Sequence, residues 1–401
     1  MSTPKTKILF LASWYPSKNS PVEGIFVQKH AEAAALFSDI SVLYLTLYTG
    51  LNGKIIEVAP IYENNVYTVR VYLSKTKIRI PFVTFLFNSF RYFIGIFLGL
   101  RLIFREKGTP ELMQVNVASR IGIIALLLKL LFRIPYIVLE HSTAYVMYKD
   151  KKEYQANITL SERIITYINY RYADGIIGVS NYLNDSIKKL KNINNRFYTV
   201  PNVIRIPEKI ERQINKNDKI KVLTISILNK KGKNIKELIN CFDLLIKGGE
   251  KDLNLYVVGD GPDKEVFERY ANELGILNKN IFFLGYVPNS ELGKYFDTVN
   301  FFVLPSKYET FSVVTAEAIA HGVPVVATKC GGPEEFVNPE QGLMVNNEDN
   351  KALIAGIEYM SNNWQNYDPN NLMNYAKSKF DSPVVGKQLV NIYNEILNFK
   401  Y

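Results

Sequence analysis

Two glutamates stand eight positions apart in the segment YETFSVVTAEAIAHGVPVVATKCGG, which begins at Tyr308. The pattern predicts a helix over 313–321, which Ser312 can cap and Gly322 can end. Glu309 then precedes the helix, and Glu317 lies more than one turn inside it. At about 100° per residue the two side chains leave a common helical face, so they do not form a simple surface pair. Carboxylates in these positions can accept hydrogen bonds from sugar hydroxyls. The structural alternative is a helix-dipole acid and a solvated helix residue.

Backbone amides at the start of this helix are the second chemical feature. The apolar run FFVLPS (301–306) predicts a buried strand, so the helix begins at the carboxyl edge of a sheet. A helix N-terminus in that place attracts phosphate. We therefore expect the amides of the first turn and the residues before it to hold a phosphate-bearing ligand. These residues are Thr310, Phe311, Ser312, Val313 and Val314.

Other residues capable of chemistry follow other predicted strands. Gly24 ends the loop after the first strand, His141 ends YIVLEH, and Lys230 and Lys231 stand in NKKG. VVGDGP carries two glycines of a dinucleotide fingerprint but has Lys264 at the third position, which is weak support for NAD binding. Each residue also has a structural alternative, namely a tight turn, a core histidine or an exposed basic turn. Their shared placement at strand ends favours one ligand site.

Strands alternate with helices through the chain, which predicts an α/β protein of two doubly wound Rossmann-like domains. The Pro-bearing, charged stretch 200–219 is typical of a linker. We expect an N-terminal domain over 1–205 and a C-terminal domain over 206–381. The last helix, in 382–401, is expected to pack back onto the first domain. The ligand should bind at the carboxyl ends of the strands, in the cleft between the domains.

Composition limits the partners and the cellular compartment. The 401 residues carry a net charge of +10, with only two cysteines and three histidines. We therefore expect a reducing cytosol and no metal site, and the N-terminus shows no signal-peptide pattern. Basic charge is compatible with nucleic acid, an anionic membrane or a phosphorylated substrate. No nucleic-acid-binding motif is present, so we expect no nucleic-acid partner.

The stretch 75–108 combines aromatic residues with Arg91, Arg101 and Arg105. The uncharged run between the first two arginines is too short to span a bilayer. This composition indicates an interfacial helix on an anionic membrane, and a buried helix is the alternative. A second apolar stretch, over 121–139, predicts a core helix followed by a buried strand.

Taken in order, these motifs resemble the retaining glycosyltransferases of family 4, which have the GT-B fold of two facing Rossmann-like domains. The resemblance rests on NKKG, VVGDGP, FLGYVPNSEL, NFFVLPS and the Glu309–Glu317 segment, with KILFLASWYP, YIVLEHS, RYADGIIGVSNYL and VPNVI in the first half. It covers nearly the whole chain and is looser over 46–110. The arginine that many relatives have before the lysine of NKKG is missing here.

The resemblance implies roles for individual residues. Glu317 would bind the ribose hydroxyls, and Glu309 the transferred sugar. Lys231, with Lys230, would neutralise the diphosphate held by the amides of 311–314. The remaining implied donor or reaction-centre contacts are Gly24, Val287 and, near the sugar, His141.

The resemblance also implies a reaction. A hexose or N-acetylhexosamine would move from a UDP- or GDP-linked donor to a glycan or lipid-linked acceptor, in polysaccharide or glycolipid biosynthesis. Retention would occur without a cofactor or metal. The protein would be cytoplasmic and peripheral on the inner face of the membrane. The alternatives are a GT-B sugar-nucleotide epimerase, an NAD-linked Rossmann enzyme, or a non-catalytic sugar-nucleotide-binding subunit.

Overall fold

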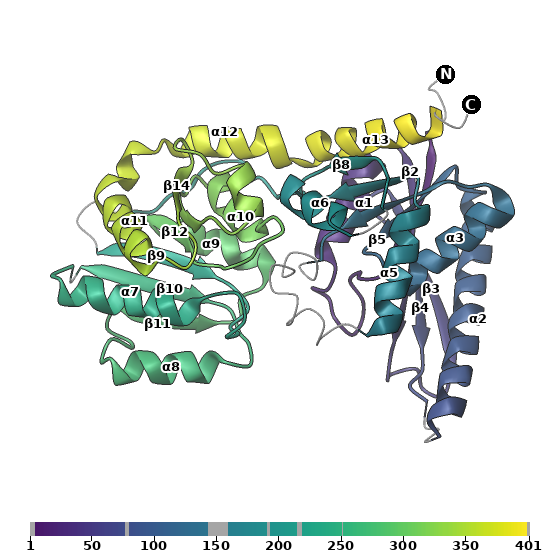
Figure 1. Cartoon of the computed structure of the whole chain (residues 1–401), viewed down its shortest axis with the longest axis horizontal. Coiled ribbons are helices and arrows are strands. Elements are labelled where there is room, and N and C mark those ends of the chain that lie inside the picture. Colours follow the sequence, from purple (N-terminus) through teal and green to yellow (C-terminus); the bar gives the residue numbers. More distant parts are fainter. Residues whose placement is uncertain are drawn as a thin grey trace. The chain divides into compact units, whose positions relative to one another are not determined.

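The computed structural model describes residues 5–76, 80–142, 159–190, 193–214, 219–250 and 252–398, and it divides into two compact units (Figure 1). Unit 1 is Met1–Val203 with Ser382–Tyr401, and unit 2 is Ile204–Asp381. Each unit contains one mainly parallel sheet with helices packed against it. The predicted α/β class with two doubly wound units is confirmed.

Unit 1 has an eight-stranded sheet in the order β3-β4-β2-β1-β5-β6-β7-β8. The strands are β1 (Lys7–Ala12), β2 (Asp39–Leu47), β3 (Ile56–Glu63), β4 (Val66–Leu73), β5 (Leu112–Asn116), β6 (Tyr136–Glu140), β7 (Gly175–Gly178) and β8 (Phe197–Thr199). All neighbouring pairs are parallel except β3 and β4. The sequence analysis did not predict β3. Its Pro60 is tolerated because β3 is at the edge of the sheet.

Six helices of unit 1 surround this sheet. They are α1 (Ile25–Ala35), α2 (Pro81–Lys107), α3 (Arg120–Phe132), α5 (Leu160–Tyr172), α6 (Asn181–Lys188) and α13 (Ser382–Asn398) within the described residues. The C-terminal helix α13 packs on α1 and buries an apolar face that includes Val385, Leu389 and Tyr393. Apolar residues at helical spacing therefore attach the end of the chain to the first unit.

Unit 2 has a six-stranded, fully parallel sheet in the order β11-β10-β9-β12-β13-β14. Its strands are β9 (Ile220–Ile225), β10 (Leu253–Val258), β11 (Ile281–Gly285), β12 (Phe301–Leu304), β13 (Val325–Thr328) and β14 (Gly342–Val345). Its helices are α7 (Ile235–Lys247), α8 (Lys264–Glu273), α9 (Leu292–Phe296), α10 (Val313–Ala320), α11 (Asn350–Asn363) and α12 (Pro369–Phe380), with short 3₁₀ turns at Asn289–Glu291, Gly332–Glu335 and Trp364–Asn366. Strands without polar alternation, such as β12, are buried on both faces.

The strand order reverses once in each unit. In unit 1 the chain moves from β1 to β2 in one direction, and it later crosses from β4 to β5 in the other. In unit 2 it moves from β9 to β10 and β11, and then crosses to β12 on the other side of β9. At such a switch point two loops leave the carboxyl edge in opposite directions and open a crevice, where α/β proteins bind ligands. The switch points lie between β1 and β5 and between β9 and β12.

Much of the predicted linker is part of unit 2. Arg212 donates hydrogen bonds to the carbonyls of Val299 (2.8 Å) and Gly322, and Gln213 N–H donates to Asp297 O at 2.7 Å. The described residues 204–214 therefore belong to unit 2. The prediction that they form a linker is wrong. Charged residues suggested solvent exposure, but the half-buried Arg212 donates to carbonyl groups that the loops would otherwise leave unpaired.

Helix α2 differs from its prediction in two ways. It continues through Arg91 and Arg101 for 27 residues, so by length and composition alone it could cross a membrane, and only 22% of its apolar window is buried. Arg91 does not face outward, because its side chain is buried and donates to Ser74 O at 2.7 Å and Ser74 Oγ at 2.9 Å. The opposite side of α2 exposes a stripe of apolar residues, comprising Phe82, Phe85, Leu86, Phe90, Phe93 and Phe97.

Candidate functional site

Glu309 lies at the switch point of unit 2, in the loop between β12 and α10. Its carboxylate accepts hydrogen bonds from Lys233 Nζ at 2.6 Å and from Ser306 Oγ at 2.8 Å. Its backbone pairs with the loop after β13, through Cys330 O and the amide of Gly332. Lys233 belongs to the loop after β9, so this ion pair joins the two loops that flank the switch point. Glu309 is therefore fixed in position, with only a tenth of its side chain exposed.

The lysine that meets Glu309 is one that the sequence analysis did not select. Lys230 pairs instead with Asp263, through its backbone N–H at 2.8 Å and its Nζ at 3.3 Å. Lys231 is exposed and makes no ion pair with any described residue. Lys231 thus keeps its charge available to a ligand, as its expected role requires, whereas Lys230 is paired with Asp263 at the surface. Lys233 is the third lysine of NKKGKN, and nothing in that motif shows its partner, which lies 76 positions away.

The start of α10 has an unusual backbone. Ser312 occupies the N-cap position with φ 73°, a left-handed conformation that is uncommon for a residue with a Cβ. The expected side-chain cap is absent, because Ser312 Oγ bonds to Thr315 Oγ1 at 2.8 Å. Thr310, Phe311 and Ser312 are buried, and the Phe311 ring packs on Phe336 and Phe380. The segment is thus held rigidly, and the first-turn amides of α10 have no acceptor within the helix.

Val313 and Val314 lie in the first turn of α10 and are half-buried. Glu317 lies in the next turn. It lines a cavity of about 350 Å³, together with Asn289, Gly293 and His321. Val287 is half-buried and follows β11, two residues before Asn289. The structure therefore brings Glu317 beside the loop that contains Val287, whereas Glu309 belongs to the switch-point loops. The two glutamates have different surroundings within one edge of unit 2.

His141 follows β6 in unit 1 and is buried beside two other rings. Its ring centroid lies 4.3 Å from that of Phe26 and 5.3 Å from that of His30. Burial lowers the pKa of His141 well below its ordinary value, and the neighbouring His30 lowers it further, while a hydrogen bond with Asn202 acts in the opposite direction. Burial also lowers the pKa of His30 to about 4. Both imidazoles are therefore neutral at neutral pH.

Glu140, directly before His141, was missed by sequence reasoning. Its fully buried carboxylate accepts hydrogen bonds from the amides of His141 (3.0 Å), Ser142 (2.8 Å) and Ala118 (3.1 Å), and from Tyr170 Oη at 2.7 Å. Burial raises the pKa of Glu140. These bonds connect the ends of β5 and β6 and fix the backbone that carries His141. The apolar run YIVL gave no sign that its following acid would turn inward.

A cavity of about 470 Å³ opens at the switch point of unit 1. It lies at the carboxyl ends of β1 and β5, between Ser13, Ser119 and Arg120 on one side and Tyr92 of α2 on the other. Ser13 Oγ bonds to Ser119 Oγ at 2.7 Å and to Val117 O at 2.8 Å. Ser142, the neighbour of His141, also lines it. Unit 1 thus has a cavity of its own at its switch point, with serine hydroxyls among a mostly apolar lining.

Two glycines have structural explanations. Gly24 is the N-cap of α1 with φ 70°, and a Cβ there would lie 2.4 Å from the carbonyl carbon of Trp14. Its approach to a donor stays a prediction. Gly259 has φ 138°, and a Cβ would lie 1.8 Å from Ser226 O. The first glycine of VVGDGP therefore allows the loops after β9 and β10 to approach each other. This structural role weakens the case for an NAD-binding glycine. Among the described residues no cluster of His, Cys, Asp and Glu could hold a metal ion.

Two sequence-family models match the chain. The model described as "Glycosyl transferases group 1" matches residues 206–379, and the model described as "Glycosyltransferase Family 4" matches residues 58–206. The first match covers nearly all of unit 2, including the Glu309–Glu317 segment. The second covers much of unit 1, including His141 and Ser119.

Curated relatives are similar over shorter stretches. An uncharacterized glycosyltransferase of Methanocaldococcus jannaschii is 29% identical over 40% of this chain and 41% of its own length. A capsular polysaccharide biosynthesis glycosyltransferase, CapM, of Staphylococcus aureus is 29% identical over 42% of this chain and 44% of its own. A GDP-mannose-dependent alpha-mannosyltransferase of Corynebacterium glutamicum is 33% identical over 28% and 26%, respectively. The alignments thus span less than half of these three relatives.

Solved structures are similar over nearly the whole chain. The sucrose-phosphate synthase of Thermosynechococcus elongatus has a TM-score of 0.75 at 19% identity, covering 98% of this chain and 99% of the other. Anabaena HepE in complex with UDP has a TM-score of 0.67 at 14% identity, covering 97% and 100%. At these identities the similarity shows the fold, and it confirms the expected α/β GT-B fold.

Proposed function

We propose a nucleotide-sugar-dependent transfer reaction for this chain, which belongs to the glycosyltransferases of group 1 and family 4. The donor would be a UDP- or GDP-linked hexose or N-acetylhexosamine, bound to unit 2. The observation that carries the proposal is the switch point between β9 and β12. There a fixed carboxylate, an available lysine and the first turn of a helix lie at one sheet edge, and Glu317 follows in the next turn.

These groups suit a ligand with one diphosphate and several hydroxyl groups. The first-turn amides of α10 and Lys231 would stabilise the charge that grows on the leaving diphosphate. Glu317 would accept hydrogen bonds from the ribose, and Glu309, held by Lys233, from the transferred sugar. Val287 would contact the base. We propose that these groups act without a divalent metal, so a chelator should leave turnover unchanged.

His141 would contribute a hydrogen bond to the transferred sugar. Its neutral imidazole, fixed by the backbone bonds of Glu140, is preorganised for one directed contact. We propose retention of the anomeric configuration, for which family membership is the support. The cavity beside Ser13 and Ser119 in unit 1 is the proposed acceptor position.

The acceptor is proposed to be a glycan or a lipid-linked glycan in polysaccharide or glycolipid biosynthesis. CapM is named for capsular polysaccharide biosynthesis, which supports the first class. The exposed phenylalanine stripe of α2 supports the second, because such a stripe suits a membrane interface. We therefore propose a peripheral position on the inner face of the membrane.

A panel of UDP- and GDP-sugars tests the proposal. The purified protein should release nucleotide from one or a few donors, faster when membrane extract supplies the acceptor. A protein that binds a donor but never releases nucleotide would be a non-catalytic subunit. Release of free sugar nucleotide with an inverted ring carbon would identify an epimerase.

A further inference from the structure

A cavity of unit 2, here called the amino-edge cavity, lies across the sheet from the proposed donor position. It measures about 480 Å³, and Gln341, which lines it, directly precedes β14. Tyr359 and Tyr367 line it from the C-terminal part of α11 and from the loop before α12. Glu309, by contrast, follows the carboxyl end of β12. Because the strands of unit 2 are all parallel, their amino and carboxyl ends lie at opposite edges, so this cavity is separate from the proposed donor site.

Three tyrosine rings line the amino-edge cavity. Tyr359 is 50% exposed, and Tyr367 and Tyr375 are half-buried. Tyr375 Oη donates to Phe336 O at 2.8 Å, which fixes that ring, and Tyr367 packs against the core of unit 2. None of the three rings makes an aromatic or cation–π contact with another described residue. Ring faces that no other aromatic group occupies can pack on the apolar C–H face of a sugar ring.

Polar side chains share the cavity with these rings. Asn371 makes no side-chain hydrogen bond with a described residue, and Asp368 uses only Oδ1, which accepts from the backbone amides of Asn370 (2.8 Å) and Asn371 (3.1 Å). Asn366 donates to Asn363 Oδ1 at 3.3 Å, and its own carbonyl oxygen has no described partner. Carboxamides both donate and accept hydrogen bonds, and so do sugar hydroxyls. These side chains therefore suit a ligand rich in hydroxyl groups.

Gln341 is the buried polar group of the cavity. Only 2% of the residue is exposed, and its Oε1 forms no hydrogen bond within the described part of the chain. A buried amide oxygen without a partner destabilises the fold, and an apolar side chain of the same length would avoid that cost. Packing alone therefore gives no reason for an amide at this position. A ligand hydroxyl in the cavity would provide the partner.

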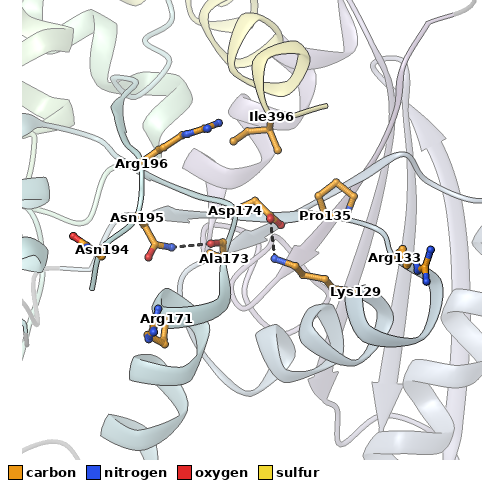
Figure 2. A pocket seen from close by; sticks show the side chains of 10 residues that line it. All are labelled: Lys129, Arg133, Pro135, Arg171, Ala173, Asp174, Asn194, Asn195, Arg196 and Ile396. Atoms are coloured by element: carbon orange, nitrogen blue, oxygen red, sulfur yellow. Dashed lines mark hydrogen bonds and ion pairs between the residues drawn. The ribbon is translucent and has the colours of Figure 1, made fainter. Parts of the chain in front are cut away.

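The charge of the amino-edge cavity disfavours an anionic ligand. Among the described residues no lysine or arginine lines it, whereas Glu340 and Asp368 do, although the chain has a net charge of +10. A cavity of unit 1 shows the contrast, because Lys129 and three arginines line it (Figure 2). There Lys129 Nζ lies 2.8 Å from Asp174, and Asn195 donates to Ala173 O at 2.7 Å, so these pairs connect neighbouring loops. The unit 2 cavity suits an uncharged ligand.

We propose that the amino-edge cavity binds a neutral glycan chain, with its tyrosine rings against sugar faces and with Gln341 and Asn371 bonded to hydroxyl groups. Aromatic rings beside acids also suit an organic cation, but a quaternary ammonium group has no hydrogen-bonding atom for the carboxamides. An acceptor chain held here would have a raised effective concentration for the reaction. The glycan class follows from the proposed function, whereas binding in this cavity needs neither donor nor turnover.

Affinity electrophoresis of the full-length protein without donor tests the inference. Each gel contains one soluble neutral polysaccharide, namely a glucan, a mannan or a galactan, because acidic polysaccharides would bind any protein of this net charge. At least one of the three should retard the wild-type protein. For that polysaccharide, Tyr359→Ala/Asn371→Ala should raise the dissociation constant about tenfold or more, through the loss of one ring and one amide. Retardation by none of the three would overturn the inference.

Gln341→Met separates binding from folding. Methionine has a similar length and removes the unpaired amide, so Tm should stay the same or rise while the dissociation constant for the polysaccharide rises about fivefold. A lower Tm with unchanged polysaccharide binding would assign the amide to the fold and contradict the proposal.

The matched control is Tyr172→Ala/Asn272→Ala, which removes the same two kinds of side chain from α5 and α8. Tyr172 is 54% exposed, Asn272 is exposed, and neither side chain has a hydrogen-bond partner among the described residues. This control should keep wild-type binding. Equal losses in the control and in Tyr359→Ala/Asn371→Ala would overturn the inference. Unchanged binding in the latter variant would also overturn it, because the glycan would then bind elsewhere.

Two further ligands identify the alternatives. Saturable binding of choline that Tyr359→Ala/Asn371→Ala abolishes, with no polysaccharide binding, would replace the glycan by an organic cation. The affinity for UDP or GDP in calorimetry should be equal in all variants, because these nucleotides are proposed to bind at the opposite edge of the sheet. A protein that binds the polysaccharide but neither nucleotide would refute the proposed function and leave this inference standing.

Discussion

Replacing Lys233 with alanine should destabilise unit 2, because it removes the charged partner of a buried carboxylate. Lys233 Nζ lies 2.6 Å from Glu309 Oε1, with only 28% and 10% of the two side chains exposed. Ser306 Oγ would remain as the only described side-chain donor to that carboxylate. Hydrogen bonds to charged groups contribute about 1.5–3 kcal/mol, and a buried carboxylate that loses its cation adds to the cost. We expect unit 2 to lose about 2 kcal/mol.

Thermal unfolding followed by circular dichroism measures this loss. Unit 2 falls in the size range in which 1 kcal/mol lowers Tm by about 2–4 °C, so Lys233→Ala should lower its transition by about 4–8 °C. Lys233→Arg keeps the charge and should recover part of the difference. Lys231→Ala removes an exposed lysine of the same loop and should stay within about 0.5 kcal/mol of wild type.

Turnover, measured together with Tm, distinguishes the two lysines further. Lys231→Ala should lower the rate of nucleotide release while leaving Tm unchanged, because its charge would act on the leaving diphosphate. Lys233→Ala should lower both quantities, since Glu309 would lose its fixed position. An unchanged Tm for Lys233→Ala would refute the argument that the ion pair holds the switch-point loops together.

Four further predictions concern the other sites. Glu317→Ala should weaken nucleotide-sugar binding in calorimetry by about 1.5–3 kcal/mol, and equal affinity would remove Glu317 from the ribose contact. His141→Ala should reduce turnover about a hundredfold or more with donor affinity kept within a few-fold, and surviving turnover would leave it a core residue. Phe90→Ser/Phe93→Ser should weaken binding to neutral and anionic vesicles alike, and unchanged binding would show that the α2 stripe does not meet lipid. Unit 1 should lose stability as the pH falls from about 6.5 to about 4, because the unfolded chain protonates His30 at its ordinary pKa, whereas the folded chain holds that pKa near 4. His30→Gln should flatten this decline in denaturant titrations, and an equally steep decline would assign it to other groups.

The sequence predicted the elements better than the contacts. Apolar runs such as FFVLPS gave the strands and their order of appearance, because burial on both faces leaves a direct trace in composition. The pairing of Lys233 with Glu309 left no such trace, since two loops meet only after the sheet has formed. Arg91 shows the same limit. Its charge indicated the surface, but the carbonyl and hydroxyl of Ser74 allow it to lie inside.

Helix α3 was predicted with its observed bounds, but the apolar pattern did not show which of its residues would be buried. Nearly all of its residues between Arg120 and Lys129 are apolar, so the sequence predicted a core helix. The buried residues Ile121, Ile124, Ala125 and Leu128 lie along one face of the helix, whereas Leu127, Leu130 and Leu131 are exposed. The packing partners decide which apolar residues are covered, and these partners are a property of the assembled unit.

A crystal structure of the protein with bound UDP or GDP would test the central claim most directly, namely that unit 2 holds the donor at its switch point. The diphosphate should lie against the amides of 311–314 with Lys231 beside it, and the ribose hydroxyls should lie within hydrogen-bonding distance of Glu317. A nucleotide bound elsewhere in unit 2, or in the cavities of unit 1, would contradict the account.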